Sequence, residues 1–355
     1  MVHIRRGAHG EAVRDIQHRL LGVGMRIDAD ELDGSFAGST EQAVRTFQRD
    51  RGLPQDGIVG PDTWSQLVEA GYRLGDRTLY LRAPAFRGDD VRELQRMLNV
   101  LGFDAGKEDG IFGPRTDGGV REFQRNVADR VDGIAGLDTV QAITRYRPSE
   151  AGPSRAVVRE AEAARGPGLT LAGAIIAIDP DPSVGEAETP VKVAASLATL
   201  LERVGARPVL LWEGSEAPEI GERVHRANAS GAAIVISIGL GSGEQLPSGT
   251  ATLHYGTPST HSPMGRRLAE SIHQLLVSAL RLEDGGVQSR SIAILRETRM
   301  PAVRVEPAVA GGRPDAEQIA RPSFANDVAR AIAEGIVAFA RPAPAPAPAD
   351  LARSV

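Results

Sequence analysis

The chain has 355 residues, enough for roughly two or three domains, and its 41% hydrophobic and 25% charged residues are typical of a folded globular protein. The net charge of −5 argues against non-specific nucleic-acid binding, and the absence of cysteine excludes disulfides and thiolate metal sites. The first residues lack the apolar segment of a secretory signal, and no run of about 18 apolar residues predicts a membrane span. We therefore expect a cytoplasmic protein.

The N-terminal half is an internal duplication. Three segments occur twice: VRDIQHRLLGVG at 13–24 and VRELQRMLNVLG at 91–102, DGSFAGSTEQAVRTFQ at 33–48 and DGIFGPRTDGGVREFQ at 109–124, and DGIVGPDTWSQL at 56–67 and DGIAGLDTVQAI at 132–143. Apolar residues at helical spacing, separated by Asp-Gly turns, predict three short helices in each copy. The sequence therefore predicts two small all-α three-helix repeats, at 1–72 and 79–147.

Four glutamines occupy equivalent places in the two repeats. Gln17 and Gln95 fall on the first helix of each copy, and Gln48 and Gln124 end the second. Their amides can pair with peptide groups of a ligand, or they can serve packing and turn chemistry instead. With these glutamines and the Asp-Gly turns, both copies resemble the three-helix peptidoglycan-binding domain. The resemblance implies that the ligand is a peptidoglycan stem peptide, which makes the four glutamines ligand-binding candidates.

The second half has a different organisation. A proline-interrupted linker is predicted at 148–173, and a disordered Pro/Ala tail at 341–355. Between them, at 174–340, strand patterns alternate with helix patterns, and continuous apolar runs such as AAIVISI are typical of strands inside a parallel sheet. We expect a three-layer α/β domain with a mixed, mostly parallel sheet.

The motifs of this domain resemble the zinc-dependent N-acetylmuramoyl-L-alanine amidases. AIIAIDP at 174–180 is similar to the family's opening strand, and ERVHRANASGAAIVISI at 222–238 to its Arg-x-x-x-Ala-Asn helix and following strand. MPAVRVEP at 300–307 is similar to the strand that carries the family's catalytic glutamate. The resemblance implies a zinc ion held by two histidines and a glutamate, and it places the catalytic glutamate at Glu306.

The residues at the implied ligand positions depart from this pattern. Pro182 stands at the first histidine position and Gly239 at the second, while the glutamate ligand falls at Glu186 or, equally well, at Glu188. A catalytic zinc needs three protein ligands and an open position for water, and neither proline nor glycine has a donor side chain. The metal site is therefore predicted to be degenerate, with no cofactor bound.

Other residues offer little to rebuild such a site. The remaining histidines of this half are expected to be at the surface or partly packed: His225, His254, His261 and His273. The glycine-rich segment at 239–249 follows a strand, but Pro247 and Gly249 stand where a phosphate-binding helix would begin. We interpret it as a strand-to-strand loop.

The domain order and the broken metal site resemble the CwlM-type proteins, cytoplasmic relatives of the wall amidases. That resemblance implies a pseudo-enzyme that binds peptidoglycan precursors or an enzyme of precursor synthesis, with the enolpyruvyl transferase as the implied enzyme partner, and that regulates peptidoglycan synthesis. The alternative is an active amidase that uses zinc to hydrolyse the bond between muramic acid and L-alanine.

Overall fold

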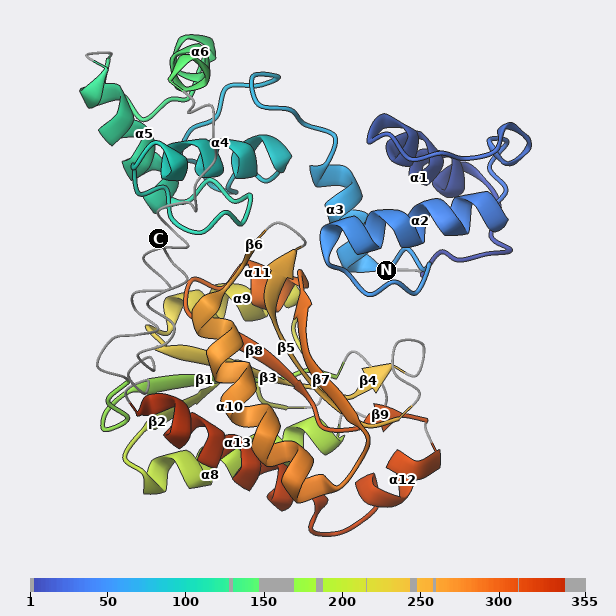
Figure 1. The fold of residues 1–355 in the computed structure, drawn as a ribbon, viewed down its shortest axis with the longest axis vertical. Coiled ribbons are helices and arrows are strands. Elements are labelled where there is room, and N and C mark those ends of the chain that lie inside the picture. The colour runs from blue at the N-terminus through green and yellow to red at the C-terminus, as the bar shows by residue number, and fades with distance from the viewer. Residues whose placement is uncertain are drawn as a thin grey trace, which may run out of the picture. The chain divides into compact units, whose positions relative to one another are not determined.

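The computed structural model describes residues 3–127, 130–146, 169–182, 188–214, 216–242, 248–257, 260–311 and 313–341. The predicted linker therefore lies outside the described residues up to 168, and the predicted tail from 342 onward. The chain forms two compact units (Figure 1). One unit contains both repeats together with Tyr255–His261 and Ser289–Arg299, and the other contains the rest of the α/β chain.

Each repeat forms the three helices that the sequence predicts. The first consists of α1 (Glu11–Gly22), a short 3-10 helix (Ala29–Glu31), α2 (Gly38–Arg51) and α3 (Pro61–Glu69), and the second of α4 (Asp89–Val100), α5 (Pro114–Asn126) and α6 (Leu137–Arg145). One apolar face of each helix packs inward around a phenylalanine, Phe47 or Phe123, that is 1% exposed. Proline opens α3 and α5 because its fixed φ suits the first helical position.

Two excursions of the α/β chain belong to the unit that holds the repeats. Lys107 Nζ donates to the carbonyl of Leu295, which lies on the short helix α11 (Ala293–Arg296), at 2.6 Å. Ser291 N donates to the carbonyl of Gly52, also at 2.6 Å. The sequence predicts one uninterrupted domain at 174–340. It does not indicate these two excursions, because hydrogen bonds between residues so distant along the chain leave no local pattern.

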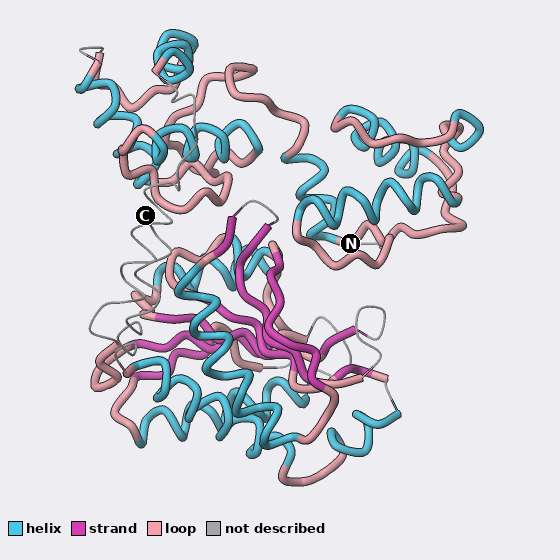
Figure 2. The backbone as a smooth tube through the Cα atoms, in the orientation of Figure 1, coloured by secondary structure: helices cyan, strands magenta, loops and turns pink. Residues whose placement is uncertain are grey.

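The other unit is built on the sheet whose strands are magenta in Figure 2. The sheet is mixed and mostly parallel, as predicted. The strand order is β2-β1-β3-β8-β5-β6, with β7 paired to β5 and a separate pair β4-β9. Strand β6 and the last residues of β5 and β7 belong to the first unit. The bounds are β1 (Ile175–Pro180), β2 (Arg207–Leu210), β3 (Ile234–Ile238), β4 (Gly241–Ser242), β5 (Thr250–Thr257), β6 (Thr260–His261), β7 (Asp284–Arg290), β8 (Ala302–Glu306) and β9 (Val309–Ala310). Strands β2, β1, β3 and β8 run parallel, and β5 is antiparallel to β8.

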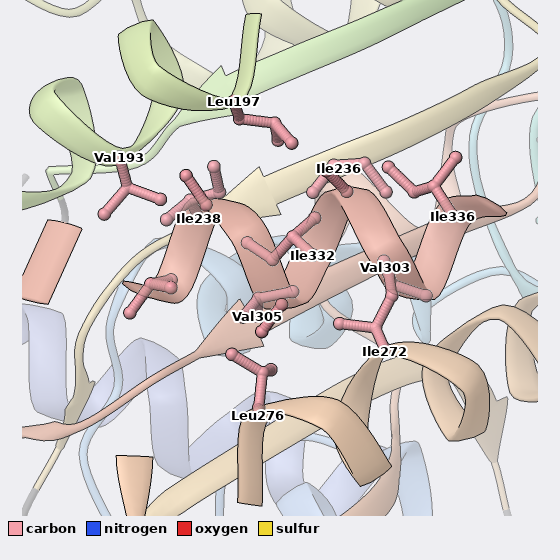
Figure 3. Close-up of a cluster of buried hydrophobic side chains, with 14 of the residues drawn as sticks. Val193, Leu197, Ile236, Ile238, Ile272, Leu276, Val303, Val305, Ile332 and Ile336 are labelled. Atoms are coloured by element: carbon pink, nitrogen blue, oxygen red, sulfur yellow. The ribbon is translucent and has the colours of Figure 1, made fainter. Parts of the chain in front are cut away.

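One face of this sheet is the apolar core. Helices α8 (Glu188–Arg203), α10 (Pro263–Leu280) and α13 (Phe324–Ala340) cover it, and the described part of the unit also contains α9 (Ile220–Ala229) and α12 (Arg313–Ile319). Figure 3 shows Ile332 of α13 among side chains of the strands and of the flanking helices. Gly335 lets α13 approach α10 closely, because a Cβ there would lie 2.6 Å from the Cα of Ile272.

The opposite face of the sheet carries a polar row. Strand side chains alternate between faces, so Asp179, Ser237 and Arg304 project away from the apolar core. The register aligns Asp179 with Ser237, and Ser237 with Arg304, across three neighbouring strands. Arg223 of α9 bonds to Asp179, which places α9 on this second face as the third layer. Among the described residues, no helix combines the length and apolar character that a bilayer crossing requires.

Candidate functional site

The structure brings three of the predicted site positions to one edge of the sheet. Pro182 follows β1, Gly239 follows β3 and Glu306 ends β8, and these strands are parallel neighbours whose carboxyl ends meet. Backbone bonds fix the edge: Asp181 N donates to the carbonyl of Ile238 at 2.7 Å, and Gly239 N donates to the carbonyl of Val305 at 3.1 Å. Glu186 lies outside the described residues.

Buried charged side chains fill this edge. Arg223 Nη1 donates to both carboxylate oxygens of Asp179, at 2.8 and 2.9 Å, and its Nη2 donates to Asp181 at 3.2 Å. Ser237 Oγ donates to Asp179 at 2.9 Å. Asp179 is fully buried, and burial raises the pKa of its carboxyl while the Arg223 charge opposes that rise.

Arg304 is the second cation of this cluster. Its Nε donates to Glu306 Oε1 at 2.9 Å, and its Nη1 donates to Asp181. Burial lowers the pKa of Arg304, but the carboxylates of Asp181 and Glu306 more than offset this and raise the pKa above its ordinary value. Two guanidinium groups and three carboxylates thus form one continuous ionic network, which already compensates most of its own charge.

The residues present do not fit the family's zinc. Neither Pro182 nor Gly239 supplies a donor atom, and a side chain at position 239 would collide with Arg304, because its Cβ would lie 2.8 Å from the guanidinium carbon. Glu188 is exposed on α8 and pairs with Lys192 at 2.6 Å, which also lowers its carboxyl pKa. Within the described ranges, no group of three histidine, aspartate or glutamate side chains could hold a metal ion.

The histidines do not rebuild the site. His225 and His261 are exposed, as expected. His254 and His273 are buried instead, at 3% and 6% exposure. His273 bridges Thr252 on β5, at 3.2 Å from its Nδ1, and Asp284 at the start of β7, at 2.8 Å from its Nε2. This bridge ties α10 to two strands, which is a structural role.

Beside the network lies a small pocket. It is lined by Gly241, Ser242, Gly249, Ala251, Gln288, Glu306 and Val309. The Glu306 side chain is 20% exposed, so its carboxylate borders this space. Asp315 shapes the wall, since its Oδ2 accepts from Gly249 N at 2.8 Å and Val309 N at 2.7 Å. Asp315 could not be predicted from the sequence, because its bond to Gly249 N joins residues far apart in the chain. Of the loop predicted at 239–249, residues 243–247 lie outside the described residues.

The four glutamines are turned inward. Each is 1% exposed, and each side-chain amide is engaged inside its own repeat. Gln48 Nε2 donates to Asp56 Oδ1 at 2.7 Å and to the carbonyl of Ile58 at 2.9 Å, and its Oε1 accepts from Gly57 N at 2.9 Å. Equivalent bonds are made by Gln95 and Gln124, while Gln17 donates to two carbonyls and a threonine.

These bonds leave no exposed amide for a ligand. The geometry favours the packing and turn role that the sequence allowed as the alternative, and ligand binding by the glutamines stays a prediction. A shared pattern could have shown this: each glutamine also contacts the threonine seven residues after the aspartate of an Asp-Gly turn, at Thr40, Thr63, Thr116 and Thr139. Each repeat is therefore held by two similar clamps, each made of a glutamine, an Asp-Gly turn and a threonine.

Comparison with known proteins agrees with this architecture. Residues 166–338 match the N-acetylmuramoyl-L-alanine amidase domain, and 9–67 and 87–143 match the putative peptidoglycan binding domain. Over 330 residues the chain is 35% identical to the N-acetylmuramoyl-L-alanine amidase CwlM of Mycobacterium tuberculosis, an alignment that covers 85% of this chain and 81% of that protein. The chain belongs to the N-acetylmuramoyl-L-alanine amidase family. The resemblances drawn from the motifs are confirmed.

Other members of the amidase family match part of the chain. The amidase CwlL of Bacillus licheniformis is 33% identical over 156 residues, which cover 38% of this chain and 43% of that protein. Among solved structures, an amidase from Clostridium difficile 630 is 20% identical with a TM-score of 0.44, covering 47% of this chain and 96% of that one. The amidase Ami1 of Mycobacterium smegmatis is 20% identical with a TM-score of 0.42, covering 48% and 98%.

Proposed function

We propose that this protein is an amidase-like pseudo-enzyme that acts in the cytoplasm, binds a peptidoglycan precursor or an enzyme of precursor synthesis, and regulates peptidoglycan synthesis. One observation carries the proposal. Arg304 fills the space beside Gly239 and binds Glu306, so the glutamate at the family's catalytic position is held in a structural ion pair.

Hydrolysis by the family's route needs a water activated by zinc and a carboxylate that accepts its proton. Here the positions that would hold zinc carry a proline and a glycine, and Glu306 Oε1 already accepts a hydrogen bond from a permanently charged arginine. The site is therefore suited to binding rather than to cleavage.

Polar groups line the pocket beside the network. The pocket offers the Glu306 carboxylate and the Ser242 hydroxyl, which can bond to peptide N–H and carbonyl groups of a stem peptide. Two peptidoglycan-binding repeats precede it in the chain. A protein that binds both a precursor and a synthetic enzyme can report precursor level, provided that the precursor binds one state of the pair more tightly than the other. We propose the enolpyruvyl transferase as the regulated enzyme.

The test uses two assays on the same preparation of the full chain. The first assay measures hydrolysis of a muropeptide, which releases the stem peptide from muramic acid. The second measures enolpyruvyl transferase activity with and without the protein across a range of precursor concentrations. We expect no release and a change in transferase activity that depends on precursor. Glu306→Gln should weaken that dependence, whereas the exposed control Glu317→Gln should not. Release of stem peptide with no effect on the transferase would establish the amidase alternative.

A further inference from the structure

The backbone conformation at position 239 does not require glycine. Among the described residues, the glycines with φ in the left-handed region do not include Gly239, so an alanine at this position would adopt the same backbone without strain. What the glycine provides is space. A Cβ at this position would lie 2.8 Å from Arg304 Cζ and 3.0 Å from its Nη1, closer than non-bonded atoms approach.

The guanidinium that occupies this space cannot easily move away. Arg304 is 5% exposed, and its Nε and Nη1 are bonded to Glu306 and Asp181 on either side. Displacing it would leave Glu306 without its cation and Asp181 with Arg223 alone, at a buried sheet edge. The clash is thus with a fixed group, although it involves the end of a long side chain.

We propose that Arg304 serves as the resident cation of this edge in place of a metal, and that Gly239 is required because it makes room for the guanidinium. The site is then closed to divalent cations in two ways: positions 182 and 239 carry no ligand side chain, and a permanent positive charge already occupies the space beside position 239 and pairs with Asp181 and Glu306. This inference concerns the metal alone and does not depend on which precursor or enzyme the protein binds.

A double-mutant cycle tests the pairing of the two residues. Trp212 Nε1 donates to the carbonyl of Pro180 at 2.9 Å, so in a Trp64→Phe background its fluorescence reports on this edge. Gly239→Ala should lower the thermal midpoint by several degrees when Arg304 is present, and by much less in an Arg304→Met background. Equal losses in both backgrounds would overturn the claim that Gly239 exists to accommodate Arg304.

Cobalt(II) absorption tests the exclusion of metal. Pro182→His with Gly239→His restores two histidines, and we expect this variant to bind cobalt at least tenfold more weakly than the same variant that also carries Arg304→Met. Arg330→Met, which removes an exposed arginine of α13, serves as the matched control and should not improve binding. Equal binding with and without Arg304, or no binding in either, would refute its role as the excluding cation. If Arg304→Met fails to fold, Arg304→Gln replaces it in both experiments.

Discussion

Replacing Gln48 by alanine tests whether the glutamines hold the repeats together or bind a ligand. The substitution removes an amide whose two N–H groups are shared among Asp56, Ile58 and Thr63, and whose oxygen accepts from Gly57 N. With about 1 kcal/mol net for each donor and for the acceptor, the upper figure is about 3 kcal/mol. Water can re-enter this surface turn, so we expect a loss of about 2–3 kcal/mol.

Urea unfolding of the full chain measures this loss. Trp64 directly follows Thr63 of the clamp, and the chain has only one other tryptophan, so a Trp212→Phe background makes Trp64 the sole reporter of the first repeat. With a denaturant slope of about 1 kcal/mol per molar for a domain of this size, the midpoint should fall by about 2–3 M. The control Gln55→Ala changes an exposed glutamine and should shift the free energy of unfolding by less than about 0.5 kcal/mol.

The opposite pattern would refute a structural role for Gln48. If Gln48→Ala leaves the midpoint nearly unchanged but abolishes muropeptide binding, the amide faces a ligand and the clamp is secondary. If stability falls as expected while muropeptide binding persists under conditions where the repeat is folded, the residue's role is structural. The two quantities are measured on the same variant, so neither outcome is ambiguous.

Three further predictions address other parts of the chain. Glu31 caps α2 by accepting hydrogen bonds from Ser39 N and Thr40 N, and although burial opposes the shift, these bonds lower the pKa of Glu31 to about 2. The stability that Glu31 contributes is therefore present above about pH 4.5 and lost as the pH falls toward 2. Glu31→Gln should cost about 1–2 kcal/mol at pH 7 and should remove this part of the acid sensitivity of unfolding, as followed by Trp64 fluorescence. Gly335→Ala should destabilise by about 1–3 kcal/mol through its clash with α10, whereas Gly118→Ala, in open space on α5, should stabilise by about 0.5–1 kcal/mol; calorimetric midpoints that move the same way would contradict this. Burial raises the pKa of Tyr255 to about 12, so stability from this group is lost between about pH 10 and 12, and Tyr255→Phe should flatten the alkaline fall of the unfolding free energy in that window.

The spacing of apolar residues in the sequence predicts most of the fold. The helices of the repeats follow from apolar residues three and four apart, and β1, β3 and β8 follow from short apolar runs whose parallel pairing brings Pro182, Gly239 and Glu306 to one edge. The strand-to-strand interpretation of 239–249 implies a strand where β5 begins, whereas no apolar pattern indicates β7, whose residues are mostly polar or glycine. Their pairing depends on partners elsewhere in the chain.

The candidate site was harder to predict than the fold. The sequence shows at Pro182 and Gly239 that two zinc ligands are missing. It does not show that the Arg304 guanidinium takes their place, because that depends on the direction of the side chain. Arg304 stands two residues before Glu306, and the period of a strand puts both on one face, so the sequence held a signal for their pairing. The burial of the glutamines was harder to predict from the sequence. A polar side chain is buried only where hydrogen-bond partners surround it, and those partners come from other parts of the repeat.

Zinc content tests the account most directly. The full chain is purified without chelators, equilibrated with zinc, separated from free metal and subjected to elemental analysis. With Pro182 and Gly239 at the ligand positions and Arg304 bonded to Asp181 and Glu306, we predict far less than one zinc per chain. Near-stoichiometric zinc that disappears on Glu306→Gln substitution would contradict the account and restore the amidase alternative.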